Sequence, residues 1–135
     1  MLLTSNRARP ARPPLKPLKW VGDSKRSLSR CPEDVKDVLG AALLDVQFGD
    51  TPAGVKPFGE GLPREIWKIV ENSGGNTYRA AYTVAFPEVV YVLDVFMKKS
   101  KSGIGTPRMD KDRVRERFTA AKRDYDAHYR TTGER

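Results

Sequence analysis

The sequence has few residues that bind metal ions or form disulfide bonds. One cysteine, Cys31, and one histidine, His128, are present among 135 residues. A lone cysteine cannot form a disulfide within the chain, and one cysteine with one histidine cannot supply a four-ligand zinc site. We therefore predict no metal ion and no cofactor. The low cysteine content is typical of a cytoplasmic protein.

Long hydrophobic runs are also missing. The longest apolar stretch, from Val89 to Val95, is interrupted by Asp94 and is much shorter than a membrane span. No phosphate-binding loop or dinucleotide-binding fingerprint is present, because Gly59-Glu60-Gly61 lacks the strand and helix that such motifs require. A catalytic triad needs a well-placed histidine, and we expect His128 to face solvent near the end of the last helix. The sequence thus predicts no membrane partner, no nucleotide-binding enzyme and no triad hydrolase.

Acidic residues are missing from the first 19 residues, which hold five basic side chains. The whole chain has a net charge of +8, so the remaining residues supply only about +3 of it. The folded part is therefore mildly basic. This charge is consistent with a polyanionic partner such as a nucleic acid. It is equally consistent with a protein whose charge only keeps it in solution.

The first 17 residues are also rich in proline, with Pro10, Pro13, Pro14 and Pro17. Proline neither continues a helix nor pairs within a sheet. We therefore predict a flexible, basic, proline-rich arm over residues 1–17, one domain over residues 18–129 and a disordered tail over residues 130–135.

Apolar patterning predicts the order of helices and strands. Residues 18–21 form a short strand, residues 23–30 a short helix, and a longer helix begins at Pro32 and ends before Gly49. The two helices are expected to form an antiparallel hairpin. Three strand-like runs follow at residues 65–71, 77–86 and 89–97, joined by short turns as an antiparallel meander, before a last helix that Asp110 caps. The predicted class is α+β, with the helical hairpin and the C-terminal helix packed on one face of a small antiparallel sheet.

Strand alternation draws attention to Arg79 in the middle strand of the meander. Residues 78, 80, 82, 84 and 86 share one face and carry most of the bulky side chains, while Arg79 lies on the other face. If the bulky face meets the helices, Arg79 points out of an uncovered face, where a guanidinium can hold a phosphate through two hydrogen bonds. The alternative is a surface arginine paired across strands with Glu71 or Asp94.

A lysine-rich segment follows the last strand. Lys98, Lys99 and Lys101 lie close together in the sequence, and Gly103 and Gly105 allow the backbone to approach a ligand. Three ammonium groups near one arginine could form an anion-binding site, but lysines also protect strand ends against aggregation. The last helix mixes basic and acidic residues, which predicts an ion-paired face exposed to solvent.

Together these segments resemble the phage-derived HigB-like branch of the RelE/ParE toxin superfamily. The matching segments are EIWKIVEN (residues 65–72), NTYRAAYTV (76–84), VVYVLDVFMKKSKSGI (89–104) and the following Thr106-Pro107. The Tyr-Arg pair in mid-strand and the Phe-x-Lys-Lys-Ser sequence after the next strand are specific in combination. With the helical hairpin and the last helix, the resemblance spans residues 18–129 and implies a RelE-like fold.

The resemblance implies the toxin of a type II toxin–antitoxin pair, which inhibits translation and growth. Such toxins are ribosome-dependent endoribonucleases that cut messenger RNA without a metal ion, leaving a 2′,3′-cyclic phosphate and a 5′-hydroxyl. The implied partners are messenger RNA, the ribosome and a cognate antitoxin, typically of the helix-turn-helix type, which would cover the basic face. By position, the implied catalytic residues are Arg79, Lys98 and Lys99, and the implied RNA-binding residues are Lys68, Lys101 and Arg108.

The sequence departs from the family pattern just after the lysines. RelE-type members carry a catalytic tyrosine there, and some HigB proteins carry an acid and a histidine, whereas this chain reads SGIGTP. The general acid and base are therefore unassigned. Two alternatives follow: a ParE-like toxin that binds DNA gyrase without cutting RNA, and a phage-encoded binding protein without toxicity.

Overall fold

The computed structural model describes residues 14–99 and 105–130. Most of the predicted arm (residues 1–13) and most of the predicted tail (131–135) lie outside the described residues. The last residues assigned to the arm join the folded domain: the backbone N–H of Lys16 donates to the carbonyl of Gln47, and that of Val90 donates to the carbonyl of Pro17, each at 3.0 Å.

Five strands form one mixed sheet in the order β1-β5-β4-β3-β2. β1 pairs with β5 in parallel, and the other neighbours pair antiparallel. The strands are β1 (Leu18–Trp20), β2 (Val55–Pro57), β3 (Ile66–Ser73), β4 (Asn76–Thr83) and β5 (Val90–Lys99), and the helices are α2 (Ser24–Ser29), α3 (Glu33–Gln47), α4 (Arg108–Tyr125) and the π-helical turn η1 (Asp126–Arg130).

The predicted α+β class and element order are confirmed, with two differences in the sheet. The strand β2 was not predicted, because three residues ending in Pro57 are too few to show an alternating pattern, and proline restricts such a strand to a sheet edge. The sheet is mixed rather than antiparallel, because β1 pairs in parallel with β5 after a long connection that contains α2, α3 and the strands β2, β3 and β4.

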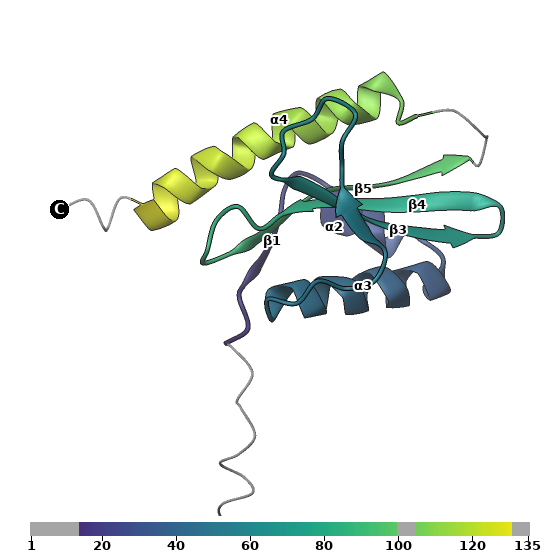
Figure 1. Cartoon of the computed structure of the whole chain (residues 1–135), viewed down its shortest axis with the longest axis horizontal. Helices are drawn as coiled ribbons and strands as arrows, with labels where there is room; N and C mark the ends of the chain where they lie inside the picture. The colour runs from purple at the N-terminus through teal and green to yellow at the C-terminus, as the bar shows by residue number, and fades with distance from the viewer. Residues whose placement is uncertain (1–13, 100–104, 131–135) are drawn as a thin grey trace, which may run out of the picture.

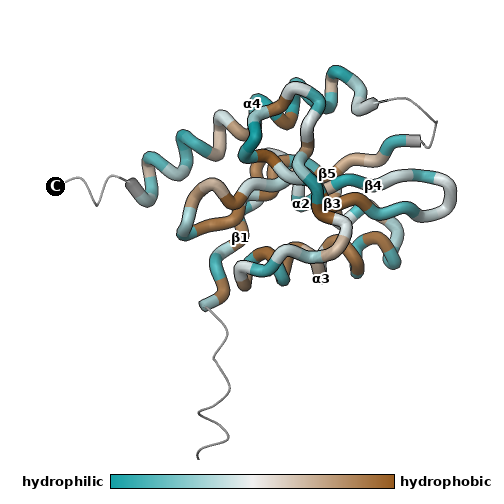
Figure 2. Tube along the Cα trace, viewed as in Figure 1, coloured by the Kyte–Doolittle hydropathy of each residue, from teal (hydrophilic) through white to brown (hydrophobic). Residues whose placement is uncertain are grey.

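The helices cover both faces of the sheet, so the prediction that they share one face is wrong. Figure 1 shows α3 and α4 on opposite sides of the strands. Two separate apolar clusters correspond to these two layers, one containing Leu39 and Leu43 of α3 and the other Val114 and Phe118 of α4. In Figure 2 the hydrophobic colouring gathers on the strands and α3, whereas much of α4 is hydrophilic. No helix among the described residues is both long and apolar enough to cross a membrane.

The hydrophilic helix α4 is held to the sheet by a buried carboxylate. Asp94 on β5 is only 2% exposed. The pairing of β4 with β5 shifts in register between Ala81, which lies opposite Asp94, and Tyr82. Arg113 donates to Asp94 at 2.8 Å and Arg117 at 3.1 Å, while Arg117 also bonds Asp23 at 2.7 Å. This network joins α4, β5 and the residue before α2.

We expect Asp94→Asn to lower the free energy of unfolding by about 3 kcal/mol, because the remaining arginines would lose a buried counter-charge. Urea denaturation followed by circular dichroism measures this loss. Asp112→Asn is the matched control, since Asp112 pairs with Arg115 in an exposed position and its loss costs far less. Equal effects of the two substitutions would contradict this role for Asp94.

Candidate nucleic-acid interface

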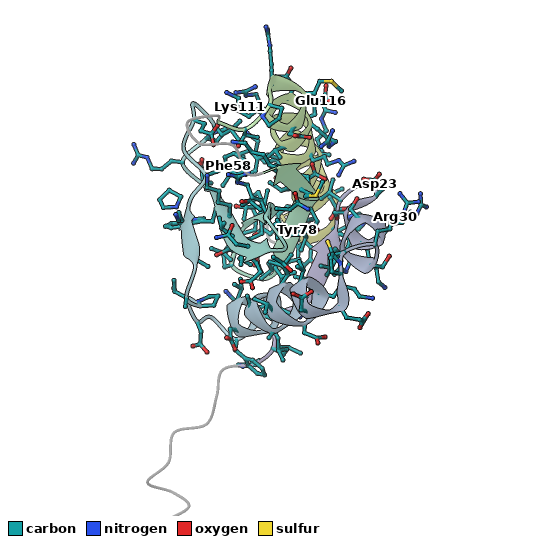
Figure 3. The ribbon with its side chains drawn as sticks, turned by 90° about the vertical axis from the view of Figure 1, so that its right-hand side faces the viewer. Asp23, Arg30, Phe58, Tyr78, Lys111 and Glu116 are labelled. Atoms are coloured by element: carbon teal, nitrogen blue, oxygen red, sulfur yellow. The ribbon has the colours of Figure 1, made fainter. Side chains whose placement is uncertain are left out.

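The alternation predicted over residues 77–86 is observed as far as Thr83, where β4 ends, whereas Phe86, predicted to share the face of Tyr78, packs against the cluster beneath α4. Tyr78, Ala80 and Tyr82 belong to the apolar cluster beneath α3, and Ala81 belongs to the cluster beneath α4. Figure 3 places Tyr78 and Phe58 on different sides of the sheet. Arg79, two residues before Ala81 on the same strand, therefore shares the α4 side of the sheet.

The Arg79 side chain is more enclosed than the sequence suggested. It lies between Val70 of β3 and Phe96 of β5 and is half-buried rather than on an open face. Its Nε and Nη1 atoms are buried and have no hydrogen-bond partner among the described residues. Buried guanidinium nitrogens are normally hydrogen-bonded, so two unpaired nitrogens are expected to destabilise the fold.

Neither acid considered as a partner for Arg79 occupies that position. Asp94 receives its hydrogen bonds from Arg113 and Arg117. Glu71 lies opposite Tyr78 in the register, so it lies on the α3 side of the sheet. The structure therefore does not support the interpretation of Arg79 as one half of a cross-strand ion pair with either residue.

Two lysines lie on the same side of the sheet as Arg79, with Lys68 on the neighbouring strand and Lys56 one strand further away. Lys56 of β2 is paired in register with Lys68 of β3. The Lys68 side chain is 12% exposed, and its ammonium lies 4.8 Å from the centre of the Phe58 ring. Burial lowers the pKa of Lys68 below its ordinary value; the charge of Glu60 opposes this shift, while the positive charge of Arg79 adds to it.

The other predicted site residues differ in how the structure places them. Lys98 pairs in register with Thr77, on the same face as Arg79 and diagonal to it, and is partly exposed. The backbone of Lys99 pairs with Asn76, but its side chain and the whole of Lys101 lie outside the described residues. Arg108 begins α4 and its side chain is 91% exposed. We call Lys56, Lys68, Arg79 and Lys98 the basic cradle.

The sequence of the chain matches a known family over most of its length. Residues 26–119 match the family described as phage-derived protein Gp49-like (DUF891). The chain belongs to this Gp49-like family. A comparison with curated proteins gave no match. The match to the Gp49-like family confirms the predicted phage-derived relationship.

Two solved structures of Escherichia coli toxin RelE are similar to this Gp49-like protein. A double-arginine mutant in the free state is 20% identical, with 82% of this chain and 98% of that chain covered and a TM-score of 0.48. The isolated toxin in a P21 crystal form is 23% identical, with 80% and 97% covered and a TM-score of 0.49.

Sequence reasoning missed two residues of the candidate site. Lys56 lies on the unpredicted strand β2, and Glu60 lies in the Gly59-Glu60-Gly61 turn, which was considered only as a nucleotide fingerprint. The spacing of glycines around an acid was the available signal for a special backbone conformation. The other interpretations hold: His128 is exposed, and the arginines of α4 are mostly ion-paired.

We expect Arg79→Met to raise the free energy of unfolding by about 1 kcal/mol, because methionine keeps the apolar stem and removes a charged group that is buried without partners. Chemical denaturation measures the change. The matched control is Arg117→Met, which removes bonds to Asp94, Asp23 and the carbonyl of Leu93 and should destabilise the protein. A clear loss of stability in Arg79→Met would show that Arg79 has a structural role.

Proposed function

We propose that this Gp49-like protein is the toxin of a type II toxin–antitoxin pair and acts as a metal-independent, ribosome-dependent messenger RNA endoribonuclease. The observation that carries the proposal is the Arg79 guanidinium, whose buried Nε and Nη1 have no partner among the described residues. The lysines of the basic cradle lie around it on the same face of the sheet. The oxygens of a phosphodiester match the fork of a guanidinium, as do those of a carboxylate.

The main requirement of the proposed reaction is positive charge that stabilises the transition state. The 2′-oxygen of a nucleotide bonds to the adjacent phosphorus while the bond from phosphorus to the 5′-oxygen breaks. One proton leaves the 2′-hydroxyl, and another is added to the departing 5′-oxygen. Charge builds on the phosphate oxygens in the transition state, and Arg79 with Lys68 and Lys98 would stabilise that charge in a partly dehydrated position.

The unpaired charge of the cradle also supports a role for an antitoxin. Most arginines of α4 are already neutralised by aspartates, including Arg113 by Asp94 and Arg115 by Asp112. The cradle contains four cationic side chains, and among the described residues the one acid paired with any of them is Glu60, which lies beside Lys68. We propose that the antitoxin covers this face with acidic residues, so that the toxin is inactive while the pair is intact.

Expression of the wild-type protein should arrest translation, and primer extension on cellular messages should show cuts in phase with codons. Arg79→Met should abolish both effects while the protein stays folded, because only the phosphate contact is lost. Arg115→Met is the matched control, since Arg115 is an exposed arginine of α4 paired with Asp112 and should leave cleavage unchanged.

Growth arrest with intact messages would contradict the nuclease proposal. DNA damage and filamentation, with gyrase trapped on cleaved DNA by the purified protein, would identify the ParE-like alternative instead. Normal growth on overexpression would exclude a toxin and leave the non-toxic binding protein.

A further inference from the structure

Glu60 lies at the edge of the basic cradle in a backbone conformation that favours glycine. Its φ angle is 55°, and the flanking Gly59 and Gly61 have φ angles of 70° and 83°. A side chain is disfavoured in this left-handed region, and residues held there often serve a functional site. The turn leads from β2 to β3 and directs an acid toward the lysine on β3.

The Glu60 carboxylate is held in place by one residue of the segment before α4. Its Oε1 accepts from the backbone N–H of Thr106 at 2.8 Å, and its Oε2 accepts from the Thr106 hydroxyl at 2.8 Å. Gly105 fits closely against it, since a β-carbon there would lie 3.0 Å from Oε1. Thr106 itself is buried, at 5% exposure. These contacts hold the carboxylate in the same position whether or not the Lys68 ammonium stays beside it.

The contact between Glu60 and Lys68 is looser than these hydrogen bonds. Lys68 Nζ lies 3.5 Å from Oε2, the oxygen that already accepts from the Thr106 hydroxyl. The ammonium therefore lies beside a fixed negative charge that it can leave without breaking the bonds to Thr106. Arg79 and Lys56 lie close enough to influence the charge of Lys68.

We propose that Glu60 is a built-in counter-ion that regulates the cradle: it holds the Lys68 ammonium in the free protein and competes for it with an RNA phosphate. The inference rests on the proposed function, since it takes the ligand to be RNA. When a phosphate reaches Arg79, Lys68 turns from Glu60 to the phosphate while Glu60 keeps its two bonds to Thr106. Glu60 thereby keeps the affinity of the empty cradle for anions low, and Lys68 is released only by a ligand that also satisfies Arg79.

The charge state of Glu60 agrees with this geometry. Burial alone would raise the pKa of Glu60, but the hydrogen bonds from Thr106 and the charge of Lys68 lower it below its ordinary value. Glu60 is therefore ionised at neutral pH and able to hold an ammonium.

The first test compares binding of a single-stranded 2′-O-methyl RNA oligonucleotide, which cannot be cleaved because it lacks the attacking hydroxyl. Glu60→Gln keeps an oxygen and an N–H₂ group for Thr106 but removes the charge beside Lys68. At low salt it should bind at least about threefold more tightly than wild type, while the slope of log K against log salt should stay near that of wild type, because Lys68 contacts the phosphate in both complexes. Fluorescence anisotropy measures both quantities.

Glu116→Gln is the matched control, because it makes the same change of charge on the side of α4 turned away from Phe58 (Figure 3). It should change the affinity by much less than Glu60→Gln. In a Lys68→Gln background, Glu60→Gln should have no further effect, since the competing ammonium is already gone. The unfolding midpoint of Glu60→Gln should stay near that of wild type, because the bonds to Thr106 remain.

The second test does not need RNA. A nuclear magnetic resonance titration of the Lys68 side chain should show a lower pKa in Glu60→Gln than in wild type, since the carboxylate that raises this pKa is removed. Glu116→Gln should leave the pKa of Lys68 unchanged. An unchanged pKa of Lys68 in Glu60→Gln would overturn the inference whether or not the protein binds RNA.

The two proposals fail in different ways. If the wild type binds the oligonucleotide and Arg79→Met does not, but Glu60→Gln binds no more tightly than Glu116→Gln, the counter-ion role is wrong and the RNA site stands. If no variant binds, or Arg79→Met binds as the wild type does, the RNA site is wrong and competition by RNA fails with it. The titration then still reports separately whether Glu60 holds Lys68.

Discussion

The buried carboxylate of Asp94 determines how the rest of the α4 side of the sheet is used. With only a few apolar residues facing the sheet, α4 depends on the bonds from Arg113 and Arg117 to this one acid for its position. Because Asp94 is fully engaged by α4, it is not available to Arg79 on the neighbouring strand. The interaction that positions the helix therefore also leaves the guanidinium of the cradle without an acid from β5.

This division of the acids explains why two arginines on the same side of the sheet have different roles. Arg117 has partners for its charge on β5 and at the start of α2, as expected for a group that stabilises the fold. Arg79 is half-buried, and two of its nitrogens have no partner in the part of the chain that the structure describes, which is costly unless another group satisfies them. A phosphate ligand, as proposed above, would remove this cost.

The fold and most of the cradle could be predicted from the sequence, because both depend on local patterns. Alternation along β4 placed Arg79 opposite the bulky face, and helical spacing found α3 and α4. The layer of α4 could not be predicted in the same way, because whether a helix crosses to the other face of a sheet depends on long-range pairs such as Arg113 with Asp94. For the same reason the enclosure of Arg79 and the contact of Glu60 with Thr106, 46 residues apart in sequence, had no local signal.

Net charge alone did not distinguish a protein that binds nucleic acid from one whose charge only keeps it in solution. The pairing of the charges favours the nucleic-acid ligand. A charge that serves only solubility would be spread over exposed side chains and paired at random with nearby acids. Here most arginines of α4 are paired, with Arg115 bonded to Asp112 and Arg117 to Asp94, whereas Nε and Nη1 of Arg79 have no partner among the described residues and Lys68 shares its acid with Thr106. Positive charge that is partly dehydrated and incompletely neutralised interacts strongly with an incoming anion, because little water must be removed and little counter-charge displaced. The proposed RNA-binding role of the cradle requires such electrostatic properties, although the cradle contributes only part of the charge of the chain.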